Sequence, residues 1–104
     1  MKVYFSVTAE QNLFDLTTYL LEEWGLNVKQ KFISKLTNKI NQISEQPLSC
    51  PKSSVVNNLF KCVVTKQTTI FYQIENINKE IQIISVFDTR QNISKLKKLR
   101  MQGA

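Results

Sequence analysis

The chain opens with alternating apolar and polar residues and then changes to helical spacing. Apolar side chains at every second position of residues 3–7 predict a short, half-buried strand. A capping box with Thr8 as N-cap and Gln11 reaching back predicts the start of a helix. Gly25 is expected to end this helix in a left-handed conformation, and Trp24 to anchor the core or the helical hairpin. The apolar face of the helix is expected to consist of Leu13, Leu16, Leu20, Leu21 and Trp24.

A second amphipathic helix is predicted directly after Gly25, with Asn27 as its N-cap and Pro47 just beyond its end. Its lysines lie on other sides of the helix and offer a basic surface. Because almost no linker separates the two helices, we expect an antiparallel helical hairpin. The apolar face of the second helix is expected to consist of Val28, Phe32, Leu36, Ile40 and Ile43.

The second half of the chain has the alternation and turn residues of a β-sheet. Residues 47–58 are expected to form a loop. Because residues 66–67 and 76–79 are short connections, neighbouring strands should run antiparallel. Strands are expected over residues 59–65, 68–75 and 80–87. Apolar residues at 93, 96 and 99 suggest a last short helix or turn.

These elements predict one α+β domain over residues 1–104, with the order β-α-α-β-β-β and a short basic C-terminal helix or tail. The helical hairpin should cover one face of a three-stranded antiparallel sheet. The other face is then free to meet a partner.

The 104 residues carry a net charge of +6, and this charge is unevenly distributed. Residues 1–25 hold one base and four acids, whereas residues 26–104 hold thirteen bases and four acids. Such an excess favours an anionic partner, either nucleic acid or an acidic protein segment. A basic surface kept for solubility explains the charge equally well. No apolar run reaches the roughly 18–20 residues that span a bilayer, so we expect a cytoplasmic protein without a membrane partner.

The absence of histidine excludes several kinds of catalytic site. Ser–His and Cys–His nucleophiles and most catalytic zinc sites need that residue, so any catalysis must use Lys, Arg, Tyr, Asp or Glu. Cys50 and Cys62 are twelve residues apart, which matches no metal or redox motif, and we expect reduced thiols, with a disulfide between them as the alternative. No metal and no cofactor is expected.

The most informative stretch is the strongly β-prone run that ends in Asp88 and Arg90. A sheet can hold the Arg90 guanidinium in a fixed, outward-facing place, with Asp88 as its orienting partner. A tail without acids follows it and adds an attractive field for an anionic target. The candidate target-binding residues are therefore Arg90, Lys95, Lys97, Lys98 and Arg100.

Three segments resemble the RelE/ParE superfamily of bacterial toxins, the toxin halves of type II toxin–antitoxin pairs. They are residues 19–25 (Tyr-Leu-Leu-Glu-Glu-Trp-Gly), 69–74 (Thr-Ile-Phe-Tyr-Gln-Ile) and 84–92 (Ile-Ser-Val-Phe-Asp-Thr-Arg-Gln-Asn). The resemblance implies a cognate antitoxin as partner and either of two activities. RelE-like members cut messenger RNA on the ribosome, and ParE-like members act on DNA gyrase.

By the same resemblance, Lys61 and Arg90 match catalytic positions of the ribonucleases. Val63 and Thr69 stand where further basic residues are expected, and the C-terminal tyrosine has no counterpart. These departures favour a ParE-like toxin that binds its target, DNA gyrase, rather than an enzyme. Two alternatives remain. One is a metal-independent, ribosome-dependent endoribonuclease that uses Arg90 and Lys61, and the other is a non-toxic antitoxin-binding module.

Overall fold

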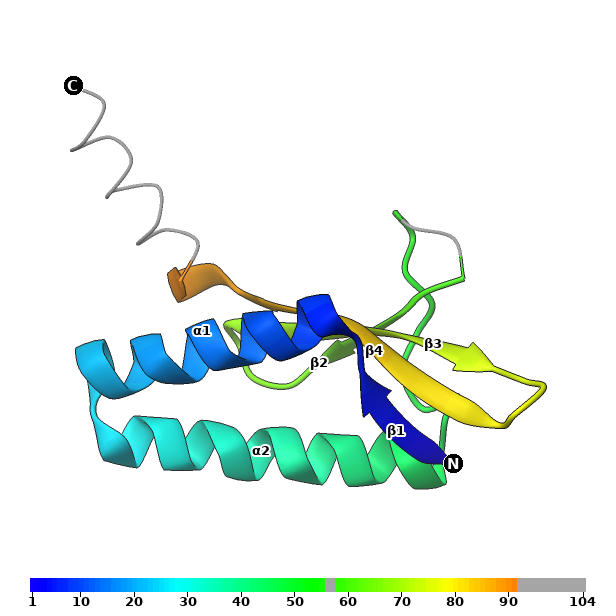
Figure 1. Cartoon of the computed structure of the whole chain (residues 1–104), viewed down its shortest axis with the longest axis horizontal. Coiled ribbons are helices and arrows are strands. Elements are labelled where there is room, and N and C mark those ends of the chain that lie inside the picture. Colours follow the sequence, from blue (N-terminus) through cyan, green and yellow to red (C-terminus); the bar gives the residue numbers. More distant parts are fainter. Residues whose placement is uncertain (56–57, 92–104) are drawn as a thin grey trace.

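The structure is a computed structural model that describes residues 1–55 and 58–91. Its elements follow the predicted order β-α-α-β-β-β (Figure 1). They are β1 Lys2–Phe5, α1 Val7–Trp24, α2 Leu26–Glu45, β2 Phe60–Val63, β3 Thr68–Glu75 and β4 Glu80–Asp88. The predicted final helix or turn, with Ile93, Leu96 and Leu99, lies outside the described residues.

The four strands form one mixed sheet in the order β1-β4-β3-β2. The β2–β3 and β3–β4 pairs are antiparallel, as predicted. β1 also joins the sheet, and it pairs with β4 in parallel, so the expectation of a three-stranded, purely antiparallel sheet was wrong. The physical reason is that both helices, β2 and β3 lie between β1 and β4 along the chain, so the connection is long enough to bring the two strands together in parallel.

The helical hairpin packs against one face of this sheet and encloses the core (Figure 1). The predicted apolar face of α2 is confirmed by the burial of Phe32, Leu36 and Ile43. In α1, Leu16 and Leu20 are buried, but Leu21 and Trp24 are 42% and 55% exposed. Trp24 therefore does not anchor the core, and only the alternative expectation, an anchor of the hairpin, stays open. Figure 1 shows why, since the last turns of α1 extend beyond the sheet. The sheet supplies Phe60, Cys62, Ile70, Tyr72, Ile81, Ile83 and Val86 to the core.

The first helix begins earlier than its capping box predicted. Ser6 is the N-cap, and its Oγ accepts a hydrogen bond from the Ala9 N–H at 3.0 Å. The same Oγ donates to the Ile84 carbonyl of β4 at 2.8 Å. Thr8 lies inside the helix. Ser6 is the cap because its hydroxyl forms a hydrogen bond both with the helix N-terminus and with a strand carbonyl. The second bond is a tertiary contact, which a local sequence motif does not reveal.

Gly25 alone separates the two helices. Its φ of 93° is positive, as expected, but its ψ of 171° places it in an extended mirror-image region rather than the left-handed helical one. That region is essentially restricted to glycine. α2 begins at Leu26, with Gly25 as its N-cap and no side-chain cap, so the cap predicted at Asn27 was wrong. In the described part of the chain, neither helix is long and apolar enough to span a membrane.

Candidate functional site

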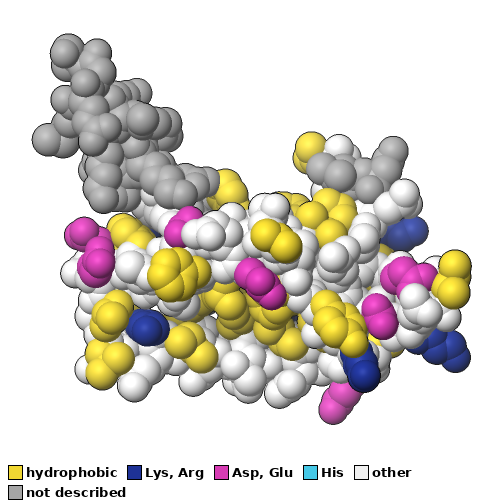
Figure 2. All heavy atoms as spheres, viewed as in Figure 1, with side chains coloured by type: hydrophobic (Ala, Val, Ile, Leu, Met, Phe, Trp, Pro, Cys, Tyr) yellow, Lys and Arg dark blue, Asp and Glu magenta, His cyan; other side chains and the backbone are white. Residues whose placement is uncertain are grey.

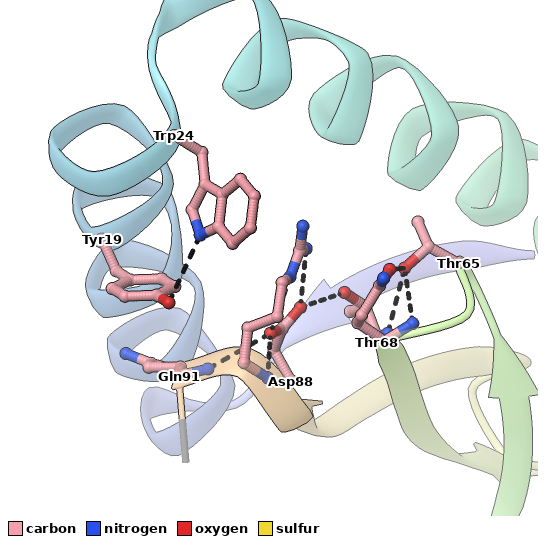
Figure 3. A network of polar contacts seen from close by, with 8 residues as sticks. Tyr19, Trp24, Thr65, Thr68, Asp88 and Gln91 are labelled. Carbon is pink, nitrogen blue, oxygen red and sulfur yellow. Dashed lines mark hydrogen bonds and ion pairs between the residues drawn. The ribbon is translucent and has the colours of Figure 1, made fainter. Parts of the chain in front are cut away.

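A buried carboxylate organises the end of β4. Asp88 is 1% exposed, and its Oδ2 accepts a short hydrogen bond from the Thr68 hydroxyl on the neighbouring strand (Figure 3). Arg90 donates to the same carboxylate, through Nε to Oδ1 at 3.2 Å and through Nη2 to Oδ2 at 3.0 Å. The backbone N–H of Arg90 also reaches Oδ1, at 2.9 Å. The predicted orienting role of Asp88 is therefore confirmed.

The electrostatics of this pair favour its charged form. Burial by itself would raise the pKa of Asp88. Hydrogen bonds from Arg90 and Thr68, together with the Arg90 charge, outweigh that effect and hold the pKa below its ordinary value. Asp88 is thus ionised at neutral pH, and it fixes the guanidinium by a bidentate contact.

Trp24 supports Arg90 from a second side. The Cζ atom of Arg90 lies 6.0 Å from the centroid of the Trp24 ring, a distance at which the ring quadrupole attracts a cation. The indole is oriented in turn, because its Nε1 donates to the Tyr19 hydroxyl at 3.3 Å (Figure 3). This role was not predicted, since a tryptophan at helical spacing resembles a core residue.

The guanidinium faces a small cavity, which we call the Arg90 pocket. The side chain of Arg90 is 19% exposed, so it is more enclosed than the outward-facing position predicted for it. The cavity measures about 160 Å³, and its described lining holds three cations and no acid. Such a lining attracts anionic groups. The Arg90 pocket is lined by Val28, Lys31, Phe32, Lys35, Thr65, Gln67 and Arg90.

The other predicted site residues lie elsewhere. Lys61 is an exposed residue of β2 between Phe60 and Cys62, which both face the core. Because side chains alternate along a strand, Lys61 projects from the face of the sheet that is turned away from the helices. Arg90 lines a pocket with α2, on the helical side. The structure therefore does not bring Lys61 and Arg90 together. The tail residues Lys95, Lys97, Lys98 and Arg100 lie outside the described residues.

A second surface, which we call the α1–α2 groove, is a wide apolar hollow of about 670 Å³ between β1 and the two helices. Figure 2 shows hydrophobic side chains gathered across this face. Tyr4, Phe14 and Ile33 are 46%, 66% and 40% exposed there. An open apolar groove of this kind fits the apolar face of a partner helix. The groove is lined by Val3, Tyr4, Phe5, Glu10, Leu13, Phe14, Thr17, Ile33, Leu36, Thr37 and Ile40.

Known proteins share this fold. The chromosomal ParDE toxin–antitoxin system from P. aeruginosa superposes with a TM-score of 0.70 at 13% identity, over 85% of this chain and 95% of that chain. The YoeB/ParE toxin from Agrobacterium tumefaciens gives 0.61 at 11% identity, over 85% and 98%. The intact E. coli RelBE toxin–antitoxin complex gives 0.57 at 17% identity, over 85% and 95%. At these identities the likeness establishes the fold alone.

The sequence itself provides the assignment. No curated protein matches it, but residues 3–93 match the family model described as the ParE toxin of the type II toxin–antitoxin system parDE. That match runs from β1 through the Arg90 network at the end of β4. The chain belongs to the ParE family of type II toxin–antitoxin toxins.

Proposed function

We propose that this toxin, as a single domain over residues 1–104, stops growth in the cytoplasm by binding DNA gyrase. The observation that carries the proposal is the fixed guanidinium of Arg90, which Asp88 holds and whose Cζ lies 6.0 Å from the centroid of the Trp24 ring. Lys31 and Lys35 line the same pocket and extend the positive surface. A preorganised arginine beside further cations suits an acidic patch on a protein target, because little side-chain entropy is lost on binding. The tail residues Lys95, Lys97, Lys98 and Arg100 belong to the proposed contact surface.

A binding mechanism is favoured over RNA cleavage by the placement of the basic residues. Cleavage through the RNA 2′-hydroxyl needs a proton acceptor, a proton donor and cations around a single phosphate. Lys61 projects from the face of the sheet turned away from the helices, whereas Arg90, the other position that matches the ribonucleases, lies beyond the end of β4 in a pocket with α2. A surface for binding requires no such convergence.

We further propose that a cognate antitoxin neutralises the toxin by laying an amphipathic helix into the α1–α2 groove. The groove is apolar and open, and Glu10 is the one charged residue in its described lining. An acidic antitoxin segment that folds on binding would also be drawn to the basic chain.

The proposed target is tested by inducing the toxin without an antitoxin and following DNA and protein synthesis by pulse labelling. We expect replication to stop first. With purified proteins, the Arg90→Ala variant should bind gyrase at least about 30-fold more weakly, the loss typical of a central arginine in an interface. Growth inhibition should be relieved in parallel.

The matched control is Lys79→Asn, which removes one positive charge at the opposite end of β4. Lys79 has a φ of 54°, a conformation that asparagine tolerates, so the fold is retained. This variant should bind gyrase like the unaltered toxin. Translation stopping before replication would instead identify a ribonuclease, and an absence of any growth effect would leave only an antitoxin-binding module.

A further inference from the structure

Residues 47–53, which precede β2, lie along the edge of the sheet and are called the strap. Lys52 pairs with Phe60 in an antiparallel bridge. The Lys61 N–H donates to the Pro51 carbonyl at 2.8 Å, and the Ser53 N–H donates to the Leu59 carbonyl at 2.7 Å. At its start the strap is fixed by the Tyr72 hydroxyl, which donates to the Pro47 carbonyl at 2.8 Å.

This register places the two cysteines opposite each other. Lys52 faces Phe60 in the antiparallel bridge, so continuing this register by two residues brings Cys50 opposite Cys62. The backbone hydrogen bonds flank the Lys52–Phe60 pair. In a regular continuation of the ladder the Cys50–Cys62 pair therefore takes the non-hydrogen-bonded spacing, in which Cα atoms are about 4.5 Å apart. That spacing lies within the range a disulfide spans, about 4.4–6.8 Å.

The two thiols are also neighbours. Both cysteines are free and buried, with Cys50 8% and Cys62 1% exposed, and Cys50 is close enough to act, after burial, on the pKa of Cys62. Two buried neighbouring thiols at facing positions of paired segments are placed for a disulfide.

We propose that Cys50 and Cys62 are a redox-sensitive pair that forms a reversible disulfide and fastens the strap to β2. The oxidant is a low-molecular-weight disulfide such as oxidised glutathione. The Cys50 thiolate attacks one of its sulfur atoms, which forms a mixed disulfide and releases one glutathione thiolate. The Cys62 thiolate then attacks the Cys50 sulfur, which closes the Cys50–Cys62 bond and releases the second glutathione. The two cysteines are oxidised, the glutathione disulfide is reduced, and the two cysteine protons go to solvent.

The order of the steps follows from exposure. Cys50 is the more exposed thiol and lies on the strap, so it meets the oxidant first. Burial, followed by the neighbouring Cys50 thiol, raises the pKa of Cys62 to about 12. The closing step is therefore slow at neutral pH and accelerates as the pH rises, because the thiolate is the nucleophile.

The test uses the full chain incubated with oxidised glutathione at pH 8, with a parallel sample in dithiothreitol. We expect a monomer that has lost both free thiols in a denaturing thiol titration and two hydrogen atoms in its intact mass. Peptide mapping without reduction should join the peptides of Cys50 and Cys62. The melting temperature should rise by about 5 °C or more, because the bond closes a loop in the unfolded chain.

The single-cysteine variants distinguish a disulfide between Cys50 and Cys62 from the reaction of one thiol with glutathione. Cys62→Ala should stop at the mixed disulfide on Cys50, with a glutathione adduct and no rise in melting temperature. Cys50→Ala should react little, since Cys62 is 1% exposed. The measurement on the unaltered chain stands alone if a variant fails to fold. Two free thiols after prolonged oxidation, or only disulfide-linked dimers, would overturn the proposal.

Discussion

At the scale of single residues, the arrangement at the end of β4 depends on Asp88. Its carboxylate accepts hydrogen bonds from Thr68, from the Arg90 side chain and from two backbone N–H groups, those of Arg90 and Gln91. A buried anion is stable only when it is this fully paired. The position of the Arg90 guanidinium therefore depends on the charge of Asp88.

This dependence predicts a change in acid stability for Asp88→Asn. Because the folded-state pKa of Asp88 is lowered, its contribution is complete above the ordinary aspartate pKa and is lost as the pH falls below about 4. At pH 7 the variant should lose about 2 kcal/mol of unfolding free energy, as expected for charged hydrogen bonds. Below pH 4 the difference should shrink.

Urea unfolding at stepped pH values measures this effect. Glu23→Gln removes an exposed acid and serves as the control, which should keep the pH dependence of the unaltered chain. An Asp88→Asn deficit that stays constant from pH 7 to pH 3 would show that charge is not the cause.

The Asp88–Arg90 pair was predictable because the two residues lie close together at the end of a strand. Thr68 and Trp24 were not, since they come from distant elements that meet only in the folded sheet and hairpin. Lys31 and Lys35 belong to the lysine side that helical spacing had indicated. What the sequence could not provide was the pocket between them and Arg90.

At the scale of elements, the spacing of apolar residues predicted the positions of helices and strands more accurately than capping motifs predicted where the helices begin. β3 spans Thr68–Glu75, as predicted, because alternation and flanking turns determine a strand locally. The predicted start of α1 was wrong because Ser6 lies beside β4 and forms a second hydrogen bond there. Helix ends, like the parallel pairing of β1, were decided by tertiary contacts.

The two candidate caps can be compared directly. Ser6→Ala should lower the unfolding free energy by about 1–2 kcal/mol, because the Ala9 N–H and the Ile84 carbonyl both lose their partner. Thr8→Ala should change it by less than about 0.5 kcal/mol, since Thr8 is an exposed residue within the helix. Chemical denaturation of the two variants provides the measurement. Equal losses would contradict the assignment of Ser6 as the cap.

The connection between the helices gives a third prediction. Gly25→Ala should lose about 1–3 kcal/mol, the cost of placing a side chain in this backbone region. No atom lies within 4 Å of the added Cβ, so the loss would come from backbone strain rather than from a clash. Thermal unfolding measures it. A melting temperature equal to that of the unaltered chain would mean that the connection adjusts without strain.

At the scale of the whole molecule, the Arg90 pocket and the α1–α2 groove are distinct surfaces. They share no lining residue in the described chain, although α2 contributes to both. Target binding and neutralisation should therefore separate by mutation. Phe14→Asp should retain growth inhibition but lose rescue by the antitoxin, because a charge in the apolar groove opposes helix docking.

Co-expression with the antitoxin, scored by colony counts, tests this separation. Ile77→Asp is the matched control, since Ile77 is 91% exposed in the β3–β4 turn and lies outside the groove lining. It should remain fully rescued. Failure of rescue in both variants would show that added charge, rather than the groove, determines the outcome.

Two different sides of α2 thus contribute to the two surfaces, the Arg90 pocket and the α1–α2 groove. Under the proposed function, residues around Phe14 and Ile33 can change together with the antitoxin, whereas those around Arg90 must keep fitting the target. Such a toxin would be able to pair with a new antitoxin while it keeps its target. The antitoxin of a related system would then no longer neutralise it.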